Sequence, residues 1–252
     1  MRNAPRTLVC ILLLGAATTH AEFPPSELKN LQVLPPETTP AELIGVMRGF
    51  AGGLGVRCQH CHVGEEGQPL SEFDFASDQK PTKQKARQML RMVNAINEQH
   101  LAGLPERSDP PVTVTCATCH HNLPKPATLE DELLAAHASG GLAAAKARYA
   151  ELREQYFGTW SYDFSLRPLN SVAERLGARG ELNDAIALQE LNREHHPEEP
   201  FVYTLLAQLY ARNQQPDRAI EALETALEVA PDEPSIPRML DWLRAQAESP
   251  SN

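Results

Sequence analysis

Two short strings in this chain repeat the same order of residue types. The first is Cys58-Gln59-His60-Cys61-His62 and the second is Cys116-Ala117-Thr118-Cys119-His120. In the spacing Cys-x-x-Cys-His, two thiols can add across the two vinyl groups of one haem to form thioether bonds. The histidine that follows can then bind the haem iron from one side. Each string therefore predicts one c-type haem that is attached covalently to the chain.

The rest of the chain holds almost no cysteine. Of its 5 cysteines, four lie in the two strings, and Cys10 lies in the N-terminal segment discussed below. Every thiol that the mature protein keeps is therefore assigned to haem, and we predict two covalently bound c-type haems. The predicted residues are Cys58, Cys61, Cys116 and Cys119 for attachment, and His62 and His120 as axial ligands of the irons.

A segment with helical periodicity and a methionine precedes each string. Between Pro40 and Val56 the apolar residues recur at helical spacing, with Thr39 placed to cap the helix and Met47 on the apolar face. A methionine thioether at the sixth position of the iron gives Met/His ligation, which raises the reduction potential. It also closes the iron to substrates. We predict that Met47 is the sixth ligand of the first haem.

The sixth ligand of the second haem has several candidates. A second helix is predicted from Pro81 to Leu101, and Met89 and Met92 lie one turn apart on one side of it. His100 lies in the last turn of that helix and would give a bis-histidine site instead. The methionines could also serve only to fill gaps in a core. The spacing alone leaves this choice open.

Several strings around the motifs resemble the photosynthetic reaction-centre cytochrome c subunit family. They are Leu31-Gln32-Val33-Leu34, Ala41-Glu42-Leu43-Ile44, Met47-Arg48-Gly49-Phe50, Ala86-Arg87-Gln88-Met89-Leu90-Arg91-Met92 and Val114-Thr115-Cys116. The resemblance implies that each haem-binding unit is a helix followed by a turn and Cys-x-x-Cys-His. It also implies that a helix methionine binds the iron. For the second haem, this sixth ligand would be Met89, the first methionine of its string, rather than Met92.

The N-terminal segment predicts export. Arg2 and Arg6 precede an apolar run from Leu8 to Ala17, which is too short for a membrane span, and small residues follow it up to Ala21. We predict a signal peptide over residues 1–21 and a periplasmic protein, free or peripheral to the inner membrane. The alternative is that the segment is kept as a membrane anchor.

Charge and composition divide the mature chain into two predicted domains. Residues 22–127 hold twelve acidic and ten basic residues, whereas residues 128–252 hold twenty-one acidic and eleven basic residues. The acidity argues against nucleic acid as a partner. A basic stretch between Lys80 and Arg91 predicts either a docking patch for an acidic redox partner, contacts to haem propionates, or a solvated helix face.

The predicted domain over residues 128–252 contains an internal repeat. Ala173 corresponds to Ala207, and Ala185 to Ala219, at a period of thirty-four residues, with proline ending each second helix. That period resembles the tetratricopeptide repeat, in which stacked helix pairs present a concave surface for a peptide or protein. A more divergent pair is predicted from Leu129 to Tyr156. The fold class predicted for the whole chain is therefore all-α, with a dihaem module followed by a short tetratricopeptide-like array.

The leading functional hypothesis is a dihaem electron carrier, not an enzyme, whose repeat domain docks a redox partner, for example a membrane-bound electron-transfer complex. A dihaem peroxidase is the enzymatic alternative, since haem peroxidase activity needs only one open iron and a distal acid or base. A third hypothesis makes the haems a redox sensor that signals through the repeats.

Overall fold

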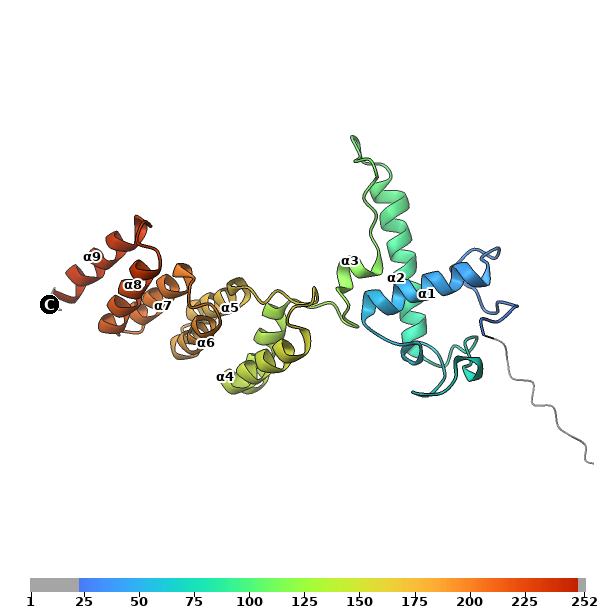
Figure 1. Ribbon diagram of the computed structural model, residues 1–252, viewed down its shortest axis with the longest axis horizontal. Helices are drawn as coiled ribbons and strands as arrows, with labels where there is room; N and C mark the ends of the chain where they lie inside the picture. Colours follow the sequence, from blue (N-terminus) through green and yellow to red (C-terminus); the bar gives the residue numbers. More distant parts are fainter. Residues whose placement is uncertain (1–22, 249–252) are drawn as a thin grey trace, which may run out of the picture. The chain divides into compact units, whose positions relative to one another are not determined.

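The computed structural model describes residues 23–248, and its architecture is all-α as predicted (Figure 1). Within this part of the chain the only sheet-like pairing is one antiparallel bridge between Val63 and Asp74. No helix in it is long and apolar enough to cross a membrane. The predicted signal peptide lies outside the described residues. The described chain forms two compact units, residues 23–51 with 56–116 and residues 52–55 with 117–248. The domain limits at residues 22, 127 and 128 remain predictions.

The first long helix, α1, covers Pro40–Leu54 and begins with a reciprocal cap. The Thr39 hydroxyl accepts a hydrogen bond from the Glu42 backbone N–H, and the Glu42 carboxylate accepts one from the Thr39 N–H at 2.8 Å. This pairing satisfies two backbone donors that an uncapped helix would leave unpaired. The predicted cap and the predicted helix are therefore confirmed.

The second predicted helix is also confirmed. It consists of α2, Pro81–Ala95, which continues directly into a π-helix, η3, over Ile96–Leu101. Pro81 occupies the first turn of α2, where its missing N–H costs no hydrogen bond. Three short elements complete this part of the chain: η1 (Cys58–His60), η2 (Leu70–Glu72) and α3 (Cys116–His120).

The remaining helices follow one another as antiparallel neighbours in sequence order. They are α4 (Leu129–Tyr156), α5 (Leu166–Ala178), α6 (Leu182–His195), α7 (Pro200–Arg212), α8 (Pro216–Val229) and α9 (Ser235–Glu248). Helices α7 and α8 begin and end thirty-four residues after α5 and α6, the same period as the repeat in the sequence. Helix α4 breaks at Gly140 and Gly141, where the predicted pair between Leu129 and Tyr156 changes direction.

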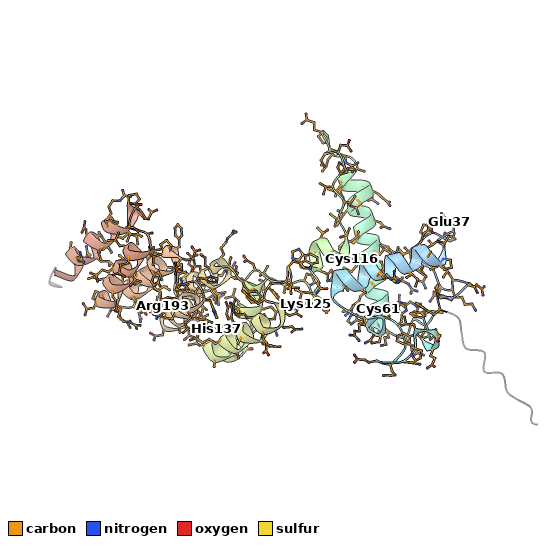
Figure 2. The ribbon with its side chains drawn as sticks, in the orientation of Figure 1. Glu37, Cys61, Cys116, Lys125, His137 and Arg193 are labelled. Carbon is orange, nitrogen blue, oxygen red and sulfur yellow. The ribbon has the colours of Figure 1, made fainter. Side chains whose placement is uncertain are left out.

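An apolar core joins these helices. It includes Leu133, Leu169, Leu176, Leu206 and Leu223, all nearly or fully inaccessible to solvent. Some buried polar side chains in the same helices are hydrogen-bonded. The Asn192 side-chain amide donates to the Leu166 carbonyl at 2.9 Å and to the Asn170 side chain at 2.7 Å. His137, labelled in Figure 2, lies 2.8 Å from the Asp184 carboxylate and links α4 to α6.

The unit that carries the first haem motif is built differently. In residues 23–51 and 56–116 no hydrophobic side chain is buried, and the buried residues are Lys83 and Arg87. The apolar faces of α1 and α2 are only half-covered. The apolar side chains therefore lie on the predicted helices, but they do not pack with one another into a buried core.

Candidate haem-binding sites

The first motif folds into a tight turn that brings its reactive groups together. The backbone N–H groups of Cys61 and His62 both donate to the Cys58 carbonyl, at 3.2 and 2.9 Å. In a 3-10 turn the side chains three residues apart lie on the same side. Cys58 is exposed and Cys61, labelled in Figure 2, is half-buried, and burial raises the pKa of the Cys61 thiol. The turn therefore brings the two thiols to one side of the chain.

The histidine that ends the first motif lies against an aromatic cluster. The His62 ring meets the Phe75 ring edge-on, with 4.9 Å between their centroids, and Phe75 in turn stacks on Phe73 at 5.6 Å. Burial, and then the positive charge of Lys83, lower the pKa of His62. A neutral imidazole is the form that binds a metal. The surroundings of His62 therefore favour the ligating form of the ring.

The start of α2 holds the first motif in place. Lys80 Nζ donates to the Gln59 carbonyl, and the Thr82 hydroxyl donates to the His60 carbonyl. Both acceptors lie between the two cysteines of the motif. The turn that carries Cys58 and Cys61 is thus tied to the first residues of the methionine-bearing helix, which the sequence reasoning had assigned to the second haem alone.

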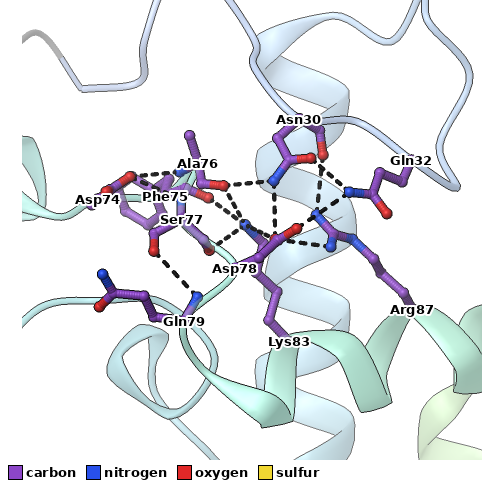
Figure 3. A network of polar contacts seen from close by, with 10 residues as sticks. All are labelled: Asn30, Gln32, Asp74, Phe75, Ala76, Ser77, Asp78, Gln79, Lys83 and Arg87. Atoms are coloured by element: carbon purple, nitrogen blue, oxygen red, sulfur yellow. Dashed lines mark hydrogen bonds and ion pairs between the residues drawn. The ribbon is translucent and has the colours of Figure 1, made fainter.

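A buried polar network fixes the loop that leads from the first motif to α2 (Figure 3). Lys83 Nζ donates to the carbonyls of Phe75, Ala76 and Ser77 at 2.9, 3.0 and 2.7 Å. Asp78 accepts from Lys83 at 3.2 Å and from Arg87 at 2.8 Å. The Arg87 guanidinium, together with Asn30 and Lys83, holds the pKa of the Asp78 carboxyl well below its usual range. The Asp78 carboxylate therefore stays negatively charged and neutralises part of the positive charge of Lys83 and Arg87.

This network corrects the prediction for the basic stretch. Lys83 and Arg87 are each 9% exposed and are occupied by the loop, so they are not available as a docking patch or a solvated helix face. Lys85 and Arg91 are exposed, as that prediction required. The sequence signal that could have revealed the difference is the spacing of four residues between Lys83 and Arg87, which places them on one helix face.

The second motif forms a short helix, α3, with the same order of ligands. Cys119 is exposed and Cys116 is half-buried. His120 Nδ1 lies 2.8 Å from the Leu123 carbonyl, and Leu123 is itself buried. Such a bond fixes the tautomer so that Nε2 is free to bind a metal, and it makes the ring a stronger donor of electrons. The arrangement is that expected of a proximal histidine.

The chain just before the second motif is fastened to η3. The Asn97 side chain accepts from the Val114 N–H and donates to the Val114 carbonyl, both at 2.8 Å. The Asn97 side chain thus satisfies both backbone groups of Val114, as a neighbouring strand would. This pairing fixes the chain two residues before Cys116. The sequence analysis gave Asn97 no role, although an amide side chain with a free donor and acceptor is suited to this function.

The turn after α1 lies very close to the backbone of Asn122. Gly55 has φ of +65°, and a Cβ atom there would lie 2.2 Å from the Asn122 carbonyl oxygen. The Asn122 N–H donates to the Gly53 carbonyl at 3.0 Å. Only glycine satisfies both the backbone angle and the contact. The glycines that follow Phe50 therefore do more than weaken the helix, because they admit the segment that follows His120.

The candidate sixth ligands occupy the helices predicted for them. Met47 is half-buried on α1, and Met89 and Met92 are 43% and 46% exposed on α2. His100 is exposed in η3. Met89 and Met92 lie on one side of α2 as expected, so the structure does not separate them, and the assignment of Met47 and Met89 to iron stays a prediction.

The described residues fit a covalently bound haem. Such a ligand needs two pairs of cysteines in turns, a histidine after each pair, and apolar helix faces that remain partly exposed, and the described residues provide all three. A flat apolar macrocycle would cover side chains such as Phe50 and Met89, which the protein leaves partly exposed. Once bound, a haem supplies one-electron chemistry at its iron.

Two comparisons with known proteins agree with this reading. Residues 28–153 match the sequence profile of the photosynthetic reaction centre cytochrome c subunit. Cytochrome c-554 from Chloroflexus aurantiacus is 37% identical over 95 residues, which cover 38% of this chain and 20% of that protein. The match thus spans about a fifth of the length of this curated relative.

Proposed function

This chain belongs to the photosynthetic reaction centre cytochrome c subunit family, and from that premise we propose that it is an exported dihaem cytochrome that passes single electrons between redox proteins. Membership in a cytochrome c family implies covalently bound haem and electron transfer. The proposal adds the number of haems, their ligands, the compartment and the role of the C-terminal helices. The observation that carries it is the pair of Cys-x-x-Cys-His turns, each with two cysteines and a histidine suited to bind iron.

At the first site, Cys58 and Cys61 would hold the haem, His62 would bind the iron and Met47 would occupy the sixth position. The half-buried position of Met47 on α1, in a chain with only 5 methionines, supports this choice. Two strong axial ligands leave no position for a substrate, so the site favours electron transfer over catalysis.

At the second site, Cys116 and Cys119 would hold the haem, His120 would bind the iron and Met89 would complete it. The bond between His120 and the Leu123 carbonyl supports the role of His120. The choice of Met89 over Met92 rests on the family resemblance, since both side chains are exposed on α2.

The C-terminal helices would form a tetratricopeptide-like array that docks a protein partner. The offset of thirty-four residues between the two central helix pairs, and alanines such as Ala173 and Ala207 buried at corresponding positions, support this assignment. The leader over residues 1–21 would direct the protein to the periplasm, where c-type haem attachment requires thiols delivered in reduced form. The redox partner there would be soluble or part of a membrane complex.

Substitution of the axial methionines tests the proposal. Met47→Ala should leave the first haem attached, because thioether bonds do not need the sixth ligand, and should lower its potential and open its iron. Met89→Ala should do the same at the second haem, whereas Met92→Ala, its matched control on the same helix, should do little. Optical spectra would follow the thioether-to-iron band and any high-spin signal.

Two results would overturn parts of this assignment. If Met92→Ala opens the iron of the second haem and Met89→Ala does not, the sixth ligand is Met92 and the assignment of Met89 is wrong by one helical turn. If the unaltered protein shows one high-spin haem that reacts with peroxide, the protein is an enzyme rather than a carrier.

A further inference from the structure

Three side chains that could bind a metal ion meet between α4 and α6, and none of them is assigned to haem. His137 Nε2 lies 2.8 Å from the Asp184 carboxylate and 3.7 Å from the Glu181 carboxylate. One ligand atom from each of the three residues lies within 4.8 Å of the other two. Among residues 23–248 no other group of three histidine, cysteine, aspartate or glutamate side chains meets in this way. The cluster is therefore a candidate metal site outside the haem motifs.

The distances in this cluster suit a small divalent cation. Nitrogen and oxygen ligands lie about 2.0–2.2 Å from zinc. Two such ligands that subtend an angle of about 90–120° at the metal are themselves about 2.8–3.8 Å apart. The distances from His137 Nε2 to the two carboxylates, 2.8 and 3.7 Å, both fall in this range. A cation between the three side chains could therefore contact all of them after small shifts of the carboxylates.

The local structure supplies these groups from two helices. Glu181 is the N-cap residue of α6, and Asp184 lies in its first turn, three residues later, a spacing that places side chains on one face of a helix. The Glu181 side chain makes no capping hydrogen bond, so its carboxylate is not used to satisfy the end of the helix. The helix dipole favours acidic residues in this turn. It does not account for the histidine of α4 that faces them.

Burial and charge distinguish the cluster from an ion pair on the surface. The His137 side chain is 8% exposed, whereas the Asp184 and Glu181 side chains are 34% and 40% exposed, so the imidazole is enclosed and the carboxylates remain open to ions and water. Within the described part of the chain His137 is the basic side chain that pairs with these carboxylates. Protonation of His137 would neutralise only one of the two negative charges, whereas a divalent cation balances both.

We propose that His137, Glu181 and Asp184 form a binding site for a divalent cation of the zinc type. An imidazole nitrogen is a good ligand for zinc and related transition metals, whereas calcium and magnesium prefer oxygen ligands. Three protein ligands leave a fourth position for water. His137 lies three residues before the break of α4 at Gly140, so the cation holds the first half of α4 against α6. This site goes beyond the proposed function, since it requires neither haem nor a redox partner.

The test measures zinc on the full-length, haem-loaded protein after treatment with a chelator. The probe is zinc chloride alone, and equilibrium dialysis followed by elemental mass spectrometry should find one tightly bound zinc per chain. His137→Gln and Asp184→Asn each remove one ligand. Each should weaken zinc binding by at least the roughly 10–100-fold that loss of an outer partner of a metal ligand costs.

Two variants serve as matched controls. His196→Gln removes another imidazole from the end of α6, and Glu228→Gln removes another carboxylate from α8. Both should retain the affinity of the unaltered protein. Calcium chloride at the same concentration should not displace the zinc, and displacement would contradict the choice of a zinc-type cation.

Asp184→Asn separates metal binding from the hydrogen bond that links α4 to α6. The asparagine oxygen still accepts from His137, so the link is kept while the carboxylate ligand is lost. Zinc should raise the unfolding temperature of the unaltered protein and should not raise that of Asp184→Asn. X-ray absorption at the zinc edge should show one imidazole, with the other ligands being oxygens.

Three results would overturn the inference. They are failure of the unaltered protein to retain zinc, equal zinc affinity in His137→Gln and Asp184→Asn, and a zinc spectrum with two or more imidazoles or with sulfur. In the first case the cluster is an ion pair only, and in the others the zinc lies elsewhere. Because iron is counted separately from zinc in the same measurement, a protein with fewer than two haems would contradict the proposed function and leave this inference standing.

Discussion

The two compact units differ in what lies at their centres. In the C-terminal helices the buried side chains are apolar, and leucines such as Leu176 and Leu206 are almost wholly inaccessible. In the unit of residues 23–51 and 56–116 the buried side chains are Lys83 and Arg87, and no hydrophobic side chain there is buried. One unit completes its core from its own chain. The unit of residues 23–51 and 56–116 is held by buried hydrogen bonds and ion pairs, and its apolar helix faces remain partly exposed. Such an arrangement fits a protein whose core includes haem.

This difference sets where stability should come from. Burial of a leucine or valine side chain contributes about 1.5–3 kcal/mol, and the helical array has many of them. The haem-binding unit must obtain most of that stabilisation from contacts with the macrocycle, because its own apolar side chains remain partly in water. Removal of haem should therefore affect the two units very differently.

The largest effect should follow from preventing attachment. Replacing Cys58, Cys61, Cys116 and Cys119 with alanine should leave residues 56–116 without a core. Hydrogen–deuterium exchange should then show almost complete loss of protection there, while α5 to α8 keep theirs, because their core needs no ligand. Full protection of residues 56–116 without haem would contradict the comparison.

The reverse experiment weakens the apolar core. Leu206→Ala should destabilise the C-terminal helices by about 2–5 kcal/mol, because it leaves a cavity among fully packed side chains. Thermal unfolding followed by far-ultraviolet circular dichroism would measure the loss. The haem absorption spectrum at room temperature should not change, and a changed spectrum would show that the haem sites depend on that core. Phe201→Ala on the same helix is the control, because Phe201 is largely exposed.

A smaller effect is expected where the backbone turns after α1. Gly55→Ala should cost about 1–3 kcal/mol from backbone strain, with a further cost from the contact at 2.2 Å with Asn122. Gly67→Ala is the matched control, because Gly67 also has positive φ, +82°, but nothing lies within 4 Å of its Cβ position. Chemical unfolding should show Gly55→Ala as the less stable variant. Equal free energies of unfolding for the two variants would mean that the close contact between Gly55 and Asn122 does not affect stability.

The smallest effect concerns the charge of Asp78 and its dependence on pH. The pKa of Asp78 is lowered in the folded protein, chiefly by Arg87, so its ionised form favours folding at pH values above the ordinary value of 3.8. That contribution is lost as the pH falls below 3.8 toward the folded-state pKa. The unaltered protein should therefore be more stable than Asp78→Asn near neutral pH, and the gap should narrow in acid. A gap that does not change with pH would show that the carboxylate charge is unimportant.

The helices could be predicted from the sequence because the signals are local. The Thr39 cap, the proline at the start of α2 and the thirty-four-residue repeat all lie within a few turns of the structure that they specify. The four cysteines of the two motifs and the histidine that ends each motif are recognisable for the same reason.

What the sequence did not reveal depends on residues far apart in the chain. The pairing of Lys83 with the Phe75 loop, the bond from Arg87 to the Asn30 carbonyl and the contact between Gly55 and Asn122 each arise only after folding. Helical periodicity reports which face of a helix a residue occupies. It does not report which loop carbonyls and carboxylates that face will meet, so it left open whether the basic stretch docks a partner, contacts haem propionates or faces solvent.

The central claim is that the protein carries two haems, each bound by one pair of cysteines. Intact and peptide mass spectrometry of the exported protein tests it most directly. The account predicts one haem on the peptide with Cys58 and Cys61, one on the peptide with Cys116 and Cys119, and no unmodified cysteine. Free thiols or a disulfide at either pair would contradict it.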